Sequence, residues 1–293
     1  MGVNRGRALQ QQMDALEVER WGWEGAPPSL TPTQSALLES TIAEVRASPL
    51  CSDTIIRGGR SAVWRFLEGA QWRAEPTPGK RVSEYFTDML RWRQVGEVDT
   101  ILQRAQSFEA EAASGKLFVR GYSLLGRPLI WFHVGRENGR DDPEANIRFL
   151  IYSVERAISA MEKEASTPAS KGQFCVVVDC SMAGAGAQLP SLAFVREAVS
   201  MLMLRYPSRL GNLFIVNSGT VVYYLWLAVS LLLSPITREK VVMVSGTETQ
   251  RREILLKYIS PEALEGGRLG CPGAPVFDVK TYLNGGGVAD ETN

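Results

Sequence analysis

Residues 174–190 read FCVVVDCSMAGAGAQLP, and this stretch decides how the rest of the chain is interpreted. An apolar run from Phe174 to Val178 meets an acid, Asp179, and is followed by a loop of small residues and by Pro190. A short apolar run bounded by turn residues is typical of a buried strand, and a proline favours the first turn of a helix. The stretch therefore predicts a strand, a small-residue loop and a helix in succession.

The same alternation continues on both sides of this stretch. We expect strands at 117–122, 128–134, 173–179, 213–216 and 240–244, and helices at 144–163, 189–205, 221–233 and 249–258. A hairpin turn at LLGRP joins the first two strands. Continuous runs of Val, Ile and Phe suit strands that are buried on both faces, as in a parallel sheet. The sequence predicts an α/β fold with a mostly parallel sheet.

The part of the chain before residue 113 has a different texture. Apolar residues fall three and four positions apart, as at Val82, Phe86 and Met89, which predicts helices at 33–47, 62–69, 80–94 and 98–112. We therefore expect four segments along the chain. They are a poorly ordered lead-in at 1–30, a helical lobe at 31–113, the α/β domain at 114–284 and a tail at 285–293.

The composition is that of an ordinary globular protein. Lys and Arg together number 32, as do Asp and Glu, so the net charge offers no argument for a nucleic-acid partner. The four cysteines include no CxxC pair, which fits a reducing compartment and disfavours a disulfide framework or a zinc site. We expect a cytoplasmic protein.

A strand followed by a glycine-containing loop and a helix suggests nucleotide binding. The dinucleotide fingerprint GxGxxG would need glycines at 184, 186 and 189, but position 189 is Leu189. The loop also follows the third expected strand rather than the first, and the chain contains no GxxxxGK[ST] motif. These departures exclude the usual phosphate cradles.

The sequence offers little for catalysis. His133 is the only histidine and lies in an apolar strand, no GxSxG elbow is present, and Asp179 has no obvious acid partner. Potential metal ligands do not cluster. We therefore expect no catalytic residues, no metal and no cofactor.

Residues 220–236, TVVYYLWLAVSLLLSPI, contain almost no polar side chain. The stretch is close to the lower length limit of a membrane span, but expected strands of one sheet flank it and Pro235 ends it. Two other interpretations stay open: a buried helix, or a helix with one face toward the core and the other toward lipid.

Five motifs in order give the chain a resemblance to the CRAL-TRIO lipid-binding family, over about residues 62–284. They are the helical-lobe segment 64–94, the Gly-Arg-Pro hairpin in 121–135, the strand and Asp loop in 176–184, the Tyr-Pro-x-Arg-x-Gly turn in 206–218, and the Pro-x-Thr-x-x-Lys run in 232–246. The resemblance implies a helical lobe followed by an α/β domain that encloses a lipid beneath a gate helix, here 220–233.

The resemblance also implies site residues. The lipid cavity would be lined by Ile130, Phe132, Val176, Val178, Phe194, Ala198 and Met201. The gate would present Tyr223, Tyr224, Trp226 and Leu227 to a membrane, and the head group would meet Ser208, Thr237 and Lys240. The phosphatidylinositol-binding branch has an acid where Ser208 stands and a basic pair where Ala70 and Gln71 stand, so its head-group site is only partly retained.

The expected ligand is a phospholipid or another lipophile, and lipid transfer would bring a monomeric protein into transient, peripheral contact with membranes. Two alternatives stay open. One is a protein-interaction module whose cavity is empty or collapsed, since Phe132 and Phe174 are bulky. The other is an enzyme that uses His133 or Asp179.

Overall fold

The computed structural model describes residues 23, 27–53, 59–136, 142–163, 172–181, 190–231, 233–267 and 277–285. Most of the expected lead-in and tail, and the glycine-containing loop at 182–189, lie outside these residues. The chain forms two compact units. Unit 1 comprises Met1–Asp99 and Leu204–Ser208, and unit 2 comprises Thr100–Met203 and Arg209–Asn293. The division thus falls at Asp99, earlier than the boundary that the sequence suggested.

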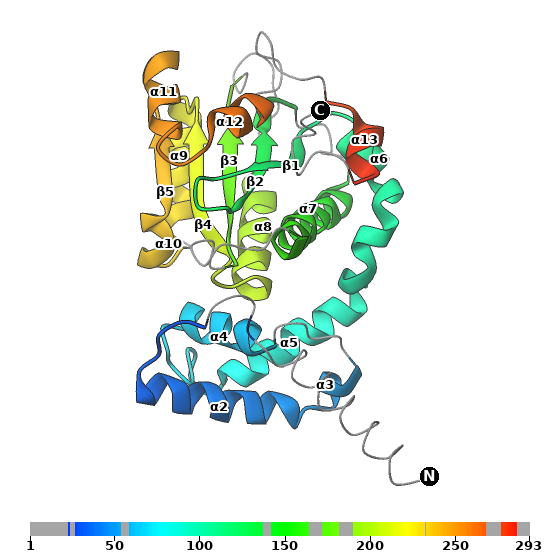
Figure 1. Ribbon diagram of the computed structural model, residues 1–293, viewed down its shortest axis with the longest axis vertical. Coiled ribbons are helices and arrows are strands. Elements are labelled where there is room, and N and C mark those ends of the chain that lie inside the picture. Colours follow the sequence, from blue (N-terminus) through cyan, green and yellow to red (C-terminus); the bar gives the residue numbers. More distant parts are fainter. Residues whose placement is uncertain are drawn as a thin grey trace, which may run out of the picture. The chain divides into compact units, whose positions relative to one another are not determined.

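Unit 1 is helical. Its helices are α2 (Pro32–Arg46), α3 (Pro49–Asp53), α4 (Gly59–Gly69) and α5 (Val82–Val95), drawn in blue to cyan in Figure 1. Helix α2 begins with a capping box, because the Thr31 hydroxyl accepts a hydrogen bond from the Gln34 amide and the Gln34 side chain accepts one from the Thr31 amide. Buried side chains from α2, α4 and α5, including Leu38, Leu67 and Phe86, form one apolar core.

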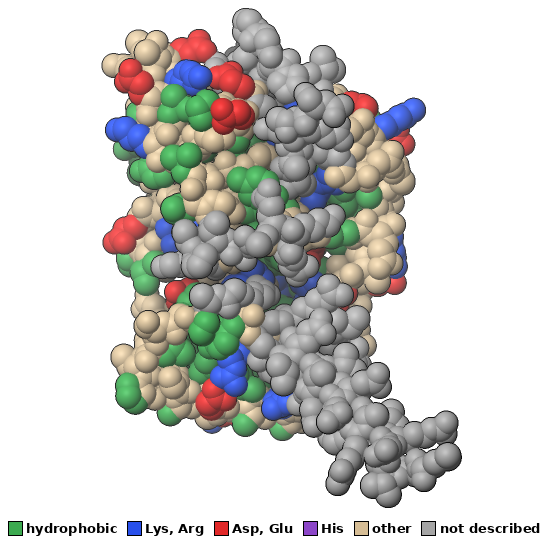
Figure 2. Space-filling model, in the orientation of Figure 1, with side chains coloured by type: hydrophobic (Ala, Val, Ile, Leu, Met, Phe, Trp, Pro, Cys, Tyr) green, Lys and Arg blue, Asp and Glu red, His purple; other side chains and the backbone are tan. Residues whose placement is uncertain are grey.

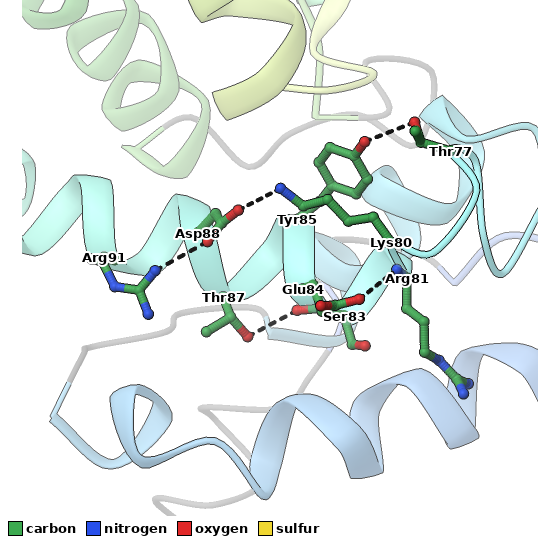
Figure 3. Close-up of polar contacts among 9 residues, drawn as sticks. All are labelled: Thr77, Lys80, Arg81, Ser83, Glu84, Tyr85, Thr87, Asp88 and Arg91. Carbon is green, nitrogen blue, oxygen red and sulfur yellow. Dashed lines mark hydrogen bonds and ion pairs between the residues drawn. The ribbon is translucent and has the colours of Figure 1, made fainter.

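The start of α5 is held by a group of polar contacts (Figure 3). Lys80 Nζ donates to Asp88 Oδ2 at 2.7 Å, and Arg91 contacts the other oxygen of Asp88 at 3.1 Å. Tyr85 donates its hydroxyl to Thr77 and lies beneath the Lys80 ammonium group, which is 4.4 Å from the ring centre. Because these groups are exposed to solvent, each pair stabilises the helix by no more than about 1 kcal/mol.

The segment after α5 corrects one expectation. Instead of a single α-helix over 98–112, the chain forms a 3₁₀ helix, η1 (Val98–Phe108), followed by a short α6 (Glu109–Ala112). Arg104 has φ −104° and ψ 25°, which lie outside the helical region and kink the segment. The apolar spacing therefore predicted a helical path correctly but could not specify the tighter hydrogen bonding.

Unit 2 contains a five-stranded sheet whose strands follow the order β1-β2-β3-β4-β5. The strands are β1 (Leu117–Tyr122), β2 (Pro128–His133), β3 (Phe174–Asp179), β4 (Leu210–Val216) and β5 (Val241–Val244). β1 and β2 are antiparallel and the other neighbours are parallel, which confirms the predicted α/β fold. Gly126, at φ 70°, supplies the left-handed residue of the hairpin turn between β1 and β2.

Helices of very different length complete unit 2 (Figure 1). They are η2 (Val134–Arg136), α7 (Pro143–Lys163), α8 (Leu192–Arg205), α9 (Thr220–Ser230), α10 (Pro235–Glu239), α11 (Glu248–Leu255), α12 (Pro261–Gly267) and α13 (Val279–Leu283). The helix expected at 221–233 ends three residues early, at Ser230. Ser234 then caps α10, and Pro235 supplies its first residue. No described helix is both long enough and apolar enough to cross a bilayer.

The two faces of the sheet differ in burial. Strand register places eight apolar side chains in two rows on one face, which we call the apolar floor: Phe132, Val178, Ile215 and Met243 in one row, and Ile130, Val176, Leu213 and Val241 in the other. Only Ile130 and Ile215 are fully buried, and the other six are partly exposed. On the opposite face, Trp131, Val177 and Phe214 are buried. That face is buried except at its edge, where Val242 is partly exposed, whereas the apolar floor is incompletely covered along most of its length.

Figure 2 shows the surface in the same orientation as Figure 1. On the described part of this face, acidic and basic side chains are interspersed, and hydrophobic side chains reach the surface between them. This mixture agrees with the equal numbers of acidic and basic residues in the sequence.

Candidate functional site

Side chains of helix α9 pack against the apolar floor. Val222 joins Val134, Cys180 and Ile215 in a small buried cluster. Six partly buried side chains pack around this cluster: Phe132, Val178, Leu213, Trp226, Val241 and Met243. Five of the six come from the floor, and Trp226 comes from α9. The helix and the floor therefore form one apolar region in which few side chains are fully buried.

Helix α9 is apolar on two opposite faces. Val222 and Val229 are buried and Trp226 is partly buried, at the i, i+4, i+7 spacing of one helix face. Tyr223, Tyr224 and Leu227 point the other way, and their exposed fractions are 49%, 65% and 43%. The structure thus brings three of the four expected gate residues together on the outer face and places Trp226 on the inner face.

The other residues expected to line a cavity lie on two elements. Ile130, Phe132, Val176 and Val178 all belong to the apolar floor. Phe194, Ala198 and Met201 share one face of α8, where Ala198 is buried and the other two are partly exposed. Sequence reasoning missed Leu213, Ile215, Val241 and Met243, although it placed all four in strands, because only the register between strands shows which of their side chains share a face.

The expected head-group residues do not lie together in one unit. Thr237 belongs to α10, where its hydroxyl lies 2.9 Å from that of Ser234. Lys240 follows the same helix, and its Nζ donates to the Leu210 carbonyl at 2.8 Å. Ser208 belongs to unit 1 and has φ 57°. Thr237 and Lys240 therefore lie just before the amino end of β5 in unit 2, whereas Ser208 belongs to the other unit.

Three polar residues meet at the carboxyl ends of β2, β3 and β4. Asp179 Oδ2 lies 3.3 Å from His133 Nδ1, while Oδ1 accepts hydrogen bonds from the Asn217 side chain at 2.8 Å and the Ser181 amide at 2.9 Å. Burial raises the pKa of Asp179, but hydrogen bonds from His133, Asn217 and Ser181 outweigh it and lower the pKa to about 2. The carboxylate is therefore ionised at neutral pH.

The second nitrogen of His133 also has a partner. Nε2 lies 3.1 Å from the Gly267 carbonyl oxygen, which is within hydrogen-bond distance. The ring is stacked between Phe118 and Trp131, at 5.6 and 6.4 Å from their ring centres, and is 4% exposed. With both nitrogens engaged and the ring enclosed, the arrangement suits a structural link between strand ends and α12 better than proton transfer to a substrate.

The sequence contains a signal for this network in the residues that end its strands. Three neighbouring strands each end at or just before a polar residue: His133, Asp179 and Asn217. Carboxyl ends of parallel strands meet at the same edge of a sheet, so these side chains had to be neighbours. Among the described residues, no group of three or more His, Cys, Asp or Glu side chains is arranged to hold a metal ion.

Residues 112–267 match the CRAL/TRIO domain, and this match spans the sheet, the apolar floor and α9. The chain therefore belongs to the CRAL/TRIO domain family.

Curated relatives agree with this assignment. The chain is 28% identical over 181 residues to a CRAL-TRIO domain-containing protein of Schizosaccharomyces pombe, covering 62% of this chain but only 16% of that protein. It is 26% identical over 222 residues to the phosphatidylinositol/phosphatidylcholine transfer protein SFH12 of Arabidopsis thaliana, covering 71% of this chain and 39% of that protein. The chain thus spans less than half the length of these two relatives.

Two further similarities extend over most of this chain and most of the matched protein. The Sec14 cytosolic factor of Schizosaccharomyces pombe is 22% identical over 264 residues, which is 85% of this chain and 87% of that protein. The crystal structure of Sfh5 superposes with a TM-score of 0.52 at 11% identity, covering 74% of this chain and 82% of that one. The structural likeness supports the fold.

Proposed function

We propose that this chain binds a lipid on the apolar floor beneath α9 and transfers it between membranes. The observation that carries the proposal is the floor itself, since six of its eight apolar side chains remain partly exposed within a folded unit. Partly exposed apolar surface of this kind is typical of a site that takes an apolar ligand. That a phosphatidylinositol/phosphatidylcholine transfer protein is among its relatives supports the same function.

Apolar contact is sufficient to hold such a ligand. Each buried CH₂ group stabilises binding by about 0.8 kcal/mol, so an acyl chain of ordinary length gains several kcal/mol from the floor alone. All eight side chains of the floor are apolar and offer no hydrogen bond to a head group. The head group of the lipid therefore lies away from the floor, and its tails lie on it.

For the head group we propose Thr237 and Lys240, which belong to the same unit as the apolar floor, whereas Ser208 belongs to unit 1 and is not part of this proposal. An ammonium group suits a phosphate, and Lys240 already uses its Nζ to hold a neutral oxygen, the Leu210 carbonyl. A phosphate that approaches this position would replace a neutral acceptor by a charged one, which strengthens the hydrogen bond. This contact would favour phospholipids over lipids without phosphate.

For transfer we propose that α9 is the gate and that its outer face meets the bilayer. Tyr223 and Tyr224 combine an apolar ring with a polar tip, which suits the membrane interface, and Leu227 adds aliphatic surface. The protein would then act as a cytoplasmic monomer that associates with membranes only during exchange.

The test is lipid content and transfer. The purified chain is analysed by native mass spectrometry with lipid extraction, and fluorescent phosphatidylcholine or phosphatidylinositol is followed from donor to acceptor vesicles. We expect co-purified lipid and protein-dependent transfer. A protein that carries no lipid and moves neither probe would overturn the proposal and favour the interaction-module alternative.

A further inference from the structure

Trp226 differs from the other aromatic residues of α9. Tyr223 and Tyr224 are exposed, whereas Trp226 is partly buried and packs against the cluster that joins α9 to the floor. It lies one turn after Val222, which contacts the floor directly within that cluster. The indole is therefore directed toward the surface on which the proposed lipid would lie.

The floor needs a cover when no lipid is present. Five of its side chains, Phe132, Val178, Leu213, Val241 and Met243, stand around the same cluster as Trp226 and are only partly buried. Exposing this surface to water would cost free energy in proportion to its area. A tryptophan side chain covers more apolar area than any other, up to about 250 Å². Trp226 is the described α9 side chain best able to supply that cover.

We propose that Trp226 occupies part of the lipid site in the lipid-free protein and is displaced when a lipid binds. This inference rests on the proposed function, because it assumes that the floor takes a lipid. The indole and the acyl chain then compete for the same apolar surface. Trp226 stabilises the empty protein and weakens the apparent affinity for lipid, since only molecules with the indole displaced can bind.

The competition predicts that Trp226→Ala affects the stability of the lipid-free protein much more than that of the lipid-loaded protein. The lipid-free protein loses the cover and its Tm falls. The lipid-loaded protein has already displaced the indole, so its Tm changes little and the shift in Tm on loading becomes larger. The affinity for fluorescent phosphatidylcholine rises by about 3- to 10-fold. A tryptophan that served only packing would lower both Tm values equally, and one that held the lipid would weaken binding.

The control is Leu264→Ala, which removes a buried side chain of α12. We expect it to lower the Tm of both states and to leave the affinity for the probe unchanged. If Trp226→Ala does not fold, Trp226→Phe provides a second measurement. Fluorescence of the wild type minus that of Trp226→Phe isolates the emission of Trp226. Quenching of this emission by acrylamide should increase when phosphatidylcholine is loaded, because the indole leaves the floor.

The outcomes separate the two proposals. If the wild type binds the probe but Trp226→Ala binds it equally or more weakly, or if loading protects Trp226 from acrylamide, the displacement is wrong and lipid binding stands. If the wild type binds neither phosphatidylcholine nor phosphatidylinositol, the proposed function fails and the displacement fails with it.

Discussion

His133 Nδ1 lies 3.3 Å from Asp179 Oδ2, and the same carboxylate accepts a hydrogen bond from Asn217 through its other oxygen. These three residues stand at the carboxyl ends of β2, β3 and β4. One partly buried carboxylate therefore ties together three neighbouring strands, and His133 extends the link to the carbonyl of Gly267 at the end of α12.

The ionisation of Asp179 should make stability depend on pH. Its pKa is about 2 in the folded protein against an ordinary value of 3.8, so the unfolded chain binds more protons between these values. The contribution is complete above about pH 4 and is lost as pH falls toward 2. It amounts to about 2 kcal/mol in the free energy of unfolding. This contribution is measured by urea unfolding of the wild type and of Asp179→Asn. The measurements are made at pH 7 and in steps down to pH 2.5.

Comparison with Asp179→Asn separates this effect from the protonation of other carboxyl groups. The variant keeps the shape and an acceptor oxygen for Asn217 but has no charge to lose. We expect the wild type to be the more stable protein at pH 7 and the difference to shrink as pH falls through the window. A difference that stayed the same at pH 7 and pH 2.5 would contradict the assigned role of the carboxylate.

Gly267 should tolerate no side chain. A Cβ at this position would lie 1.9 Å from Cε2 of Trp131, far inside contact distance, and the carbonyl of the same residue is the partner of His133. We expect Gly267→Ala to lower the free energy of unfolding by about 1–3 kcal/mol, as overpacking of a filled core does. Gly219→Ala is the matched control, because an added methyl there meets nothing within 4 Å. Equal stability of the two variants in urea would show that α12 adjusts freely.

The strands and long helices could be predicted because their signals are local. Runs such as the one ending at Asp179 show strands through composition, and the spacing of Val82, Phe86 and Met89 shows a helix. The short helices could not be predicted. Helix α12 has too few residues to be stable alone, and its position depends on close packing of Ala263 against Gly121 and of Gly267 against Trp131. Such contacts exist only after the chain has folded.

The candidate site, like the fold, could be predicted only in part from the sequence. The resemblance to the CRAL-TRIO family implied that Ile130, Phe132, Val176 and Val178 line the lipid site, and strand register places these four side chains on one face. The side on which Trp226 lies could not be predicted, because a helix that is apolar all round gives no sign of which face turns inward. Packing of α9 against the floor decides it, and this packing separates Trp226 from Tyr224.

The outer face of α9 provides a prediction about transfer. Tyr224 is 65% exposed, so Tyr224→Asp should change the free energy of unfolding by less than about 0.5 kcal/mol. A carboxylate at a membrane interface is unfavourable, and we expect transfer of fluorescent phosphatidylcholine between vesicles to slow several-fold. Val95→Asp is the control, since Val95 is an exposed apolar residue of unit 1, and it should leave transfer unchanged. Unchanged transfer by Tyr224→Asp would count against α9 as the membrane-contacting gate.

Lys240 provides a prediction about head-group preference. Lys240→Met keeps the aliphatic part of the side chain but removes the hydrogen bond to the Leu210 carbonyl, which should cost about 0.5–1.5 kcal/mol of stability. If the ammonium group also meets a phosphate, binding of phosphatidylinositol should weaken while binding of diacylglycerol, which has no phosphate, stays the same. Lys257→Met, at an exposed position, controls for the loss of one positive charge. Equal weakening for both lipids would mean that Lys240 supports the fold of the site and does not read the head group.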